Sequence, residues 1–139
     1  RDDNGNWNQQ VKLVAPDADD NDSFGNSVDM HESTAIIGAW WDDNVERNTT
    51  DSGSAHIFVR DGDTWVFEAK LQDAVGEADD RFGNRVAIWK DTAVVGASGD
   101  NSKDGNDAGS AYVFIRTGDA WTSQAQLGKR MRVVFFFSE

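Results

Sequence analysis

Apolar and polar residues alternate along most of this chain in short runs, as is typical of β-strands. The first run covers residues 7–14 and places Trp7, Gln9, Val11 and Leu13 on one face of a predicted strand. Glycines and acidic residues separate the runs that follow, and no segment has the helical spacing of apolar residues. The pattern therefore predicts an all-β protein.

Four more strands are predicted in the first half of the chain. The first of them turns Val28 and Met30 inward, and a short polar turn leads to a second strand that is apolar on both faces. Such a strand fits a sheet that is covered on both sides. A longer acidic loop and a turn at Gly62 then join the last two strands. The four predicted strands cover residues 25–30, 34–39, 54–60 and 65–71.

The same order of motifs occurs a second time along the chain. The tryptophans of the repeated units lie 58 and 56 positions apart, and the difference of two falls in a loop between Ala39 and Gly53. A period of this length indicates a solenoid, a propeller or another array whose units bury their faces against their neighbours. The paired motifs are Phe24-Gly25-Asn26 with Phe82-Gly83-Asn84, Thr34-Ala35-Ile36 with Thr92-Ala93-Val94, Gly53-Ser54-Ala55 with Gly109-Ser110-Ala111, and Trp7 with Trp65 and Trp121.

Charge restricts the partners that the chain can bind. Of its 139 residues, 25 are Asp or Glu and 13 are Lys or Arg, so the net charge is −12. Phosphate backbones and anionic lipid surfaces repel such a chain, and we therefore expect neither a nucleic-acid partner nor membrane insertion. Basic partners and divalent metals stay open, as does a role of the charge in solubility alone. The absence of cysteine excludes disulfides and thiolate–zinc sites.

The length fits a single domain over residues 1–139, but the last twelve residues depart from the repeat. They hold three basic residues and the apolar run Val133-Val134-Phe135-Phe136-Phe137. An unpaired run of this kind favours aggregation. Three interpretations stay open for residues 128–139: a strand that caps an open edge, a strand swapped within an oligomer, or an end created by truncation or frameshift.

The repeated motifs resemble those of a known family. Two in-phase copies of Phe-Gly-Asn-x-Val, Thr-Ala-Ile/Val-Ile/Val-Gly-Ala and Gly-Ser-Ala are similar to the FG-GAP repeats of integrin-α-like β-propellers, especially the bacterial type. The resemblance covers residues 7–127 and implies one four-stranded antiparallel blade per repeat, with the Phe-Gly strand innermost and the Trp-led strand outermost. It implies blade units at about 24–71 and 82–127. Because two blades do not close the usual ring, homo-oligomerisation or a longer parent chain would complete it.

The resemblance also raises calcium as a candidate cofactor. In the family a calcium loop joins the first two strands, whereas here that link is the short turn at 31–33 or 89–91. Acidic groups occur one connection later, and oxygen ligands at alternate positions suit a hard cation. Neither loop has a glutamate at its twelfth position, and a solvated acidic loop is the alternative. The candidate metal ligands are Asp100, Ser102, Asp104 and Asp107 in the second unit, and Asp42, Asn44, Glu46 and Asp51 in the first.

A further acidic run precedes the first Phe-Gly motif. Asp17, Asp19 and Asn21 alternate as cation ligands would, but their counterparts in the second unit do not. Asp and Asn side chains commonly cap their own backbone in turns. The run is therefore predicted to form turns rather than a metal site.

The tryptophans divide into two groups. Trp7, Trp65 and Trp121 recur in phase, which predicts packing between blades. Trp40, Trp41 and Trp89 do not recur, and we predict them as a ligand-binding platform for a sugar ring or a partner protein. Burial against a neighbouring chain is the alternative for this second group.

Catalytic residues are not apparent. His56 aligns with Tyr112, which predicts a half-buried strand position, and His31 lies in a turn. Neither a Ser-His-Asp arrangement nor a distinct pair of carboxylates for glycoside hydrolysis emerges from the sequence. We therefore predict no catalytic residue and no enzyme.

Taken with the resemblance, these patterns imply an extracellular or cell-surface module, secreted and bacterial, for adhesion or recognition. It would bind a protein or carbohydrate ligand with calcium as a candidate cofactor, and form a homo-oligomer. Two alternatives stay open: a lectin-like sugar-binding propeller and a fragment of a glycoside hydrolase-type enzyme.

Overall fold

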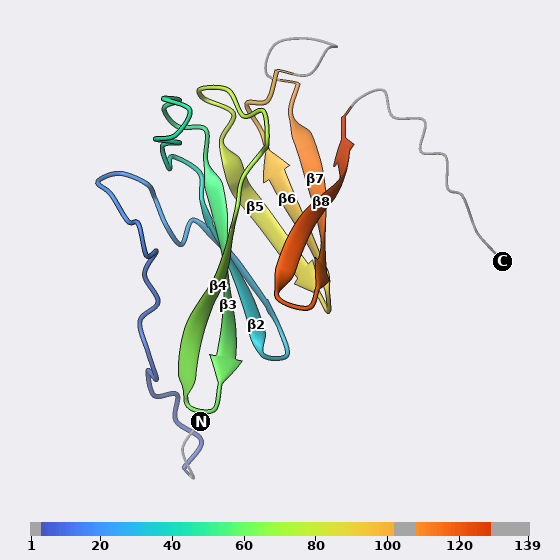
Figure 1. Ribbon diagram of the computed structural model, residues 1–139. Coiled ribbons are helices and arrows are strands. Elements are labelled where there is room, and N and C mark those ends of the chain that lie inside the picture. Colours follow the sequence, from blue (N-terminus) through green and yellow to red (C-terminus); the bar gives the residue numbers. More distant parts are fainter. Residues whose placement is uncertain (1–3, 102–107, 129–139) are drawn as a thin grey trace, which may run out of the picture.

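The computed structural model describes residues 4–101 and 108–128 (Figure 1). These residues form two antiparallel four-stranded sheets, each with its strands in sequence order, and contain no helix. The predicted all-β fold with four-stranded blades is confirmed. Blade 1 consists of β1 (Ser27–His31), β2 (Thr34–Ala39), β3 (Ser54–Asp61) and β4 (Thr64–Leu71), and blade 2 of β5 (Phe82–Trp89), β6 (Thr92–Ala97), β7 (Ser110–Thr117) and β8 (Ala120–Leu127).

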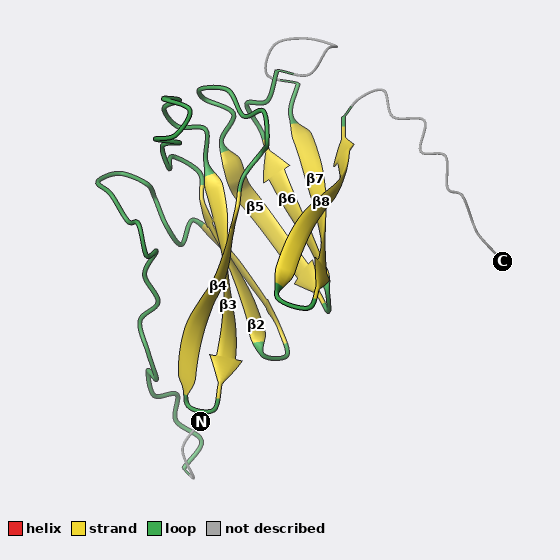
Figure 2. Cartoon of the chain, viewed as in Figure 1, coloured by secondary structure: helices red, strands yellow, loops and turns green. Residues whose placement is uncertain are grey.

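The connections are of two kinds, and they lie at opposite ends of the blades (Figure 2). Tight turns within each blade form what we call the turn end. The connections over residues 40–53 and 72–81, and the described residues 98–101 and 108–109, form the loop end. Loops at one end of a rigid scaffold are where binding residues are commonly found.

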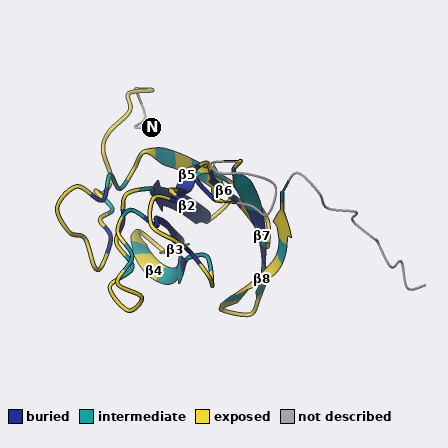
Figure 3. Ribbon diagram, turned by 90° about the horizontal axis from the view of Figure 1, so that it is seen from above, coloured by how far each residue is buried: buried dark blue, intermediate teal, exposed yellow. Residues whose placement is uncertain are grey.

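The apolar core lies between the two blades, as the view along the strands shows (Figure 3). Ile36, Ala55 and Ile57 of blade 1 pack against Phe82 and Val95 of blade 2, and all five are fully buried. All six residues of β2 are buried, which agrees with its prediction as a strand covered on both faces. Each sheet therefore stabilises the other by removing its apolar face from water.

The Phe-Gly motif of blade 2 makes the closest approach between the blades. Gly83 has φ +89°, and a Cβ atom there would lie 2.0 Å from the carbonyl oxygen of Ser54. The N–H of Phe82 donates to the carbonyl of Ser52 at 2.9 Å, and the Phe82 ring is fully buried. Glycine is needed at position 83 because any side chain would meet the backbone of blade 1.

Two expectations from the sequence were wrong. Residues 7–14 form no strand, because no strand of the described chain is hydrogen-bonded to them in a sheet. Val28 and Met30 are exposed by 66% and 61% rather than pointing inward. They lie on the face of β1 that points away from blade 2. The terminal segment 129–139, for which three interpretations were open, lies outside the described residues.

We predict that Gly83→Ala destabilises the protein by about 3 kcal/mol or more, because the methyl group would meet the Ser54 carbonyl. The matched control is Gly62→Ala, at φ +59° with nothing within 4 Å of the added atom, which we expect to cost only about 1–2 kcal/mol of left-handed strain. Urea unfolding measures both changes. Equal losses would show that the close approach between the blades does not matter.

Candidate functional site

An acidic pocket opens at the loop end of blade 1. It has a volume of about 280 Å³, and its wall comes from the segment before β1, the β2–β3 connection and the end of β4. Six carboxylates line it against a single ammonium group, so the pocket carries a strong negative charge. The lining residues are Asp17, Asp19, Asp22, Asp42, Asp43, Asn44, Val45, Glu46, Lys70 and Gln72.

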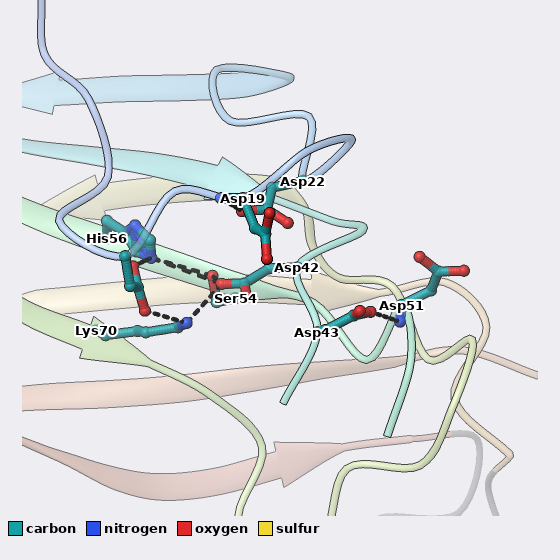
Figure 4. Close-up of polar contacts among 9 residues, drawn as sticks. Asp19, Asp22, Asp42, Asp43, Asp51, Ser54, His56 and Lys70 are labelled. Carbon is teal, nitrogen blue, oxygen red and sulfur yellow. Dashed lines mark hydrogen bonds and ion pairs between the residues drawn. The ribbon is translucent and has the colours of Figure 1, made fainter. Parts of the chain in front are cut away.

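Lys70 holds the inner wall of the acidic pocket together. Its Nζ lies 2.7 Å from Asp17 Oδ2 and 2.7 Å from Asp42 Oδ2 (Figure 4). Burial opposes the charge of this ammonium, but the two carboxylates outweigh burial and raise the pKa of Lys70. Burial likewise acts to raise the pKa of Asp17, but the bond and charge of Lys70 prevail and lower it. The lysine therefore acts as a tethered cation between two carboxylates.

His56 lies beneath this ion pair on β3 and is fully buried rather than half-buried as predicted. Its Nε2 lies 3.2 Å from Ser54 Oγ and 3.8 Å from oxygens of both Asp17 and Asp42. Ser54 donates a short hydrogen bond to Asp42, so His56 Nε2–H donates to Ser54 in turn. Burial lowers the pKa of His56, which keeps the ring neutral. The Nδ1 atom then carries no proton, and no group of the described residues donates a hydrogen bond to it.

This arrangement is not a catalytic triad. In a triad the serine donates to one ring nitrogen and the carboxylate holds the other. Here the serine and both carboxylates lie on the Nε2 side of His56, and Ser54 and His56 are both inaccessible to solvent. Local sequence patterns do not predict this cluster, because Asp17, Asp42 and His56 are far apart in the sequence and His56 does not recur in the second repeat.

A metal ion is the next possibility for the same group. The ligand atoms of Asp17, Asp42 and His56 lie within 4.8 Å of one another. However, the inner oxygens already bind Lys70, and Asp42 also accepts from Ser54. A cation at this inner position would have to displace the Lys70 ammonium. Four further carboxylates line the pocket without an ion pair to Lys70, and they are the groups that could hold a hard cation: Asp19, Asp22, Asp43 and Glu46.

The structure places only some of the predicted metal ligands together. Asp42, Asn44 and Glu46 line the acidic pocket, and they are joined by Asp17 and Asp19, for which the sequence favoured turn formation. Asp51 does not line the pocket, although its N–H donates to Asp43 Oδ1 at 2.8 Å. Asp100 lies in blade 2, whereas Ser102, Asp104 and Asp107 lie outside the described residues.

Blade 2 carries a related network without a cation. Tyr112 replaces His56, and its hydroxyl lies 2.9 Å from Asp73 Oδ2 and 2.7 Å from Asp100 Oδ2. Gln126 stands where blade 1 has Lys70, and its Nε2 donates to Asp100 Oδ2 at 2.9 Å. Burial, reinforced by hydrogen bonds to both carboxylates, raises the pKa of Tyr112, so the phenol stays protonated. The two blades thus carry different charges at equivalent positions: blade 1 has the cation Lys70 where blade 2 has the neutral Gln126.

Asp80 is the most perturbed carboxylate of blade 2. It is 2% exposed, its Oδ2 accepts the N–H of Glu77 at 2.6 Å, and its Oδ1 has no hydrogen-bond partner among the described residues. Burial and the nearby charges of Asp100 and Asp73 raise the pKa of Asp80 to about 6.

The predicted tryptophan platform is divided between the two ends of the blades. Trp40 and Trp41 stack on one another at the loop end, with ring centroids 5.0 Å apart, and Arg81 lies 5.8 Å above Trp40. Trp89 lies at the turn end, where its ring packs on that of His31 with 4.1 Å between the ring centroids. Of the recurring tryptophans, Trp121 packs against the core between the blades, whereas Trp7 is 80% exposed.

Comparison with known protein families identifies the repeat. The model of the FG-GAP repeat family matches residues 7–58 and 65–114, and the chain therefore belongs to this family, as its motifs predicted. The repeats indicate a propeller-type module for recognition rather than catalysis. A search of curated proteins found no match. Within the described residues, no helix is long and apolar enough to cross a membrane.

We expect Lys70→Gln, which installs the residue of blade 2, to destabilise the protein by roughly 2 kcal/mol, because it leaves Asp17 and Asp42 unneutralised side by side. Lys90→Gln at the turn end is the control with the same change of charge. Chemical denaturation measures both variants. If the two variants lose equal stability, only net charge matters and the ion pair is not stabilising.

Asp80 should make stability depend on pH. Because its folded pKa of about 6 exceeds the unfolded value of 3.8, the folded state holds an extra proton between these values. The stability that Asp80 contributes through this proton is fully present below pH 3.8 and is lost as the pH rises through 6. When the pH falls from 7 to 4, the free energy of unfolding of the wild type should therefore rise by about 2 kcal/mol relative to that of Asp80→Asn. Parallel stability curves for the two proteins would contradict the assignment.

Proposed function

We propose that this chain is an extracellular adhesion module that binds a protein ligand through a calcium ion held at the mouth of the acidic pocket. The observation that carries the proposal is the excess of carboxylates in that pocket, six against the single ammonium of Lys70. Calcium requires six to eight oxygen ligands and accepts carboxylates, carbonyls and ligand oxygens together. An ion at the mouth would leave coordination positions free for an acidic group of the partner.

The position of the inner lysine supports an outer calcium site. Lys70 binds both Asp17 and Asp42 and offsets one of their two negative charges, so a second cation has less to gain at the inner wall. Asp19, Asp43 and Glu46 have no such cation, and they come from two different loops. A divalent ion that joins these loops would hold the loop end in one conformation and prepare it for the partner.

Sugar binding is a second candidate, because Trp41 is 41% exposed and its neighbour Asp42 lines the acidic pocket. An aromatic face beside a cation that takes hydroxyl oxygens suits a sugar ring. A catalytic role has less support, since the buried Ser54 and His56 lack triad geometry. Secretion, a bacterial origin, homo-oligomer formation and the absence of a nucleic-acid partner stay predictions, and the net charge of −12 supports the last of these.

Calorimetric titration with calcium chloride tests the proposal. The wild type should bind calcium in the range of extracellular modules, with a Kd of roughly 10⁻⁴–10⁻³ M. The double variant Asp43→Asn, Glu46→Gln should bind at least about tenfold more weakly, because it loses two carboxylate ligands. The matched control, Asp61→Asn with Asp63→Asn, removes the same charge at the turn end.

The outcomes separate specific binding from general attraction. Equal weakening in both double variants would show that calcium responds to net charge alone, and an absence of binding heat in the wild type would exclude the site. For the sugar candidate, Trp41→Ala should abolish binding on a glycan array while calcium binding persists.

A further inference from the structure

The contact between the two blades depends on hydrogen-bond acceptors along β1. The N–H of Val86 donates to Ser27 Oγ at 3.0 Å, and the N–H of Ile88 donates to Asp29 Oδ2 at 2.8 Å. Residues 27 and 29 alternate along the strand, so both side chains point to the same neighbour. The N–H groups belong to the edge of β5 that is not paired with β6, and no strand of the described chain forms a backbone ladder with this edge. Side chains of blade 1 thus satisfy the open edge of blade 2.

A third acceptor on β1 is His31 Nδ1, to which the N–H of Lys90 donates at 3.3 Å. A further acceptor lies on the outermost strand, β4. The register of β3 and β4 shifts at Ile57/Phe58, which leaves Glu68 as the extra residue of a bulge. Its Oε1 accepts from Trp121 Nε1 at 2.7 Å and lies 3.5 Å from Arg116 Nε. We call Ser27, Asp29 and Glu68 the acceptor set of blade 1. The set fixes blade 2 at its inner and outer strands together.

Blade 2 presents the equivalent face to solvent, but without the acceptors of Ser27 and Asp29, and with a neutral amide in place of the Glu68 carboxylate. By the repeat, Arg85 stands at the position of Ser27 and Ala87 at that of Asp29, and both are exposed. Arginine has donors only and alanine has no polar group. The matching bulge between β7 and β8 leaves Gln124 in place of Glu68. This face can therefore not bind the edge N–H groups of another blade as blade 1 does.

The exposed face of blade 1, in contrast, retains the apolar side chains that a docked blade needs, although the N–H of Met30 already donates to Asp29 Oδ1 at 2.9 Å. Val28 and Met30 stand where Val86 and Ile88 contact blade 1, and Trp65 stands at the position of Trp121. A mainly apolar cavity of about 340 Å³ lies on this face, lined by Leu13, Val14, Phe24, Val28 and Ile37 among others. The face thus continues the geometry of the interface already present within the chain.

We propose that the acceptor set selects which blade docks on which, and that the exposed face of blade 1 binds a blade of different sequence that carries acceptors at these three positions. Blade 2 of a second copy lacks the acceptors at two of these positions and has only a neutral amide at the third, so copies of this chain do not join head to tail through these faces. Ring closure by identical copies is thereby disfavoured against closure by other FG-GAP blades. The acceptor set determines specificity, because a blade without it covers the edge N–H of Val28 and offers it no hydrogen-bond acceptor.

The test installs the acceptor set on blade 2. The triple variant Arg85→Ser, Ala87→Asp, Gln124→Glu should self-associate about a hundredfold more tightly than the wild type, as two or three recovered hydrogen bonds would provide. Light scattering over a concentration series at 0.15 M salt measures both proteins. The substitutions make the chain more acidic, so general charge repulsion opposes the expected gain. Any displacement of residues 7–14 by an incoming blade costs the same in both proteins.

The matched control adds Met30→Glu to the triple variant. Met30 is exposed, so this change leaves the blade folded but places a charge on the accepting face, and it should return the variant to the mass of the wild type. The proposal is overturned if the triple variant and the wild type have the same mass at every concentration, whether both are monomers or both assemble.

A second measurement tests the acceptor set within the single chain. Asp29→Ala removes the acceptor of the Ile88 N–H, so hydrogen exchange at that amide should accelerate at least about tenfold. The amide of Val95, in the central strand β6, serves as the reference. Unchanged exchange at Ile88 would show that Asp29 does not hold the edge of blade 2, and would also overturn the proposal.

Discussion

The crossing of the Phe82-Gly83 segment over the backbone of blade 1 is the contact on which the remaining structure depends. It places a fully buried phenylalanine between two sheets while its N–H pairs with the carbonyl of Ser52. Once this crossing is fixed, β5 lies along β1 and the apolar faces of both blades close together. The Phe-Gly pair therefore combines the two properties that the junction needs, a large apolar side chain and a backbone without one.

The two repeats share a backbone but differ in their electrostatics. Blade 1 places Lys70 between two carboxylates above a neutral histidine, whereas blade 2 places Gln126 and Tyr112 in the same positions. Such exchanges leave the strands unchanged because they occur where β3 and β4 reach the loop end. This separation of scaffold and loop end allows one fold to present different charges to different ligands.

The residues of the candidate site differ in how far the sequence could predict them. Asp42, Asn44 and Glu46 were found because alternating oxygen ligands in one loop form a local pattern. Lys70, Ser54 and His56 were missed, since they lie on strands and approach the loop only after the sheet has formed. Val28 and Met30 were misjudged because alternation shows that two faces differ, but it does not show whether a second sheet covers the apolar one.

By itself, the sequence determined the repeat, the β class and the positions of most strands, because each follows from local spacing. The tertiary structure alone decided which carboxylates share a pocket, which nitrogen of His56 faces them, and which faces of the two blades stay exposed. These features depend on contacts between residues that are distant in sequence, and local patterns carry no information about such distances.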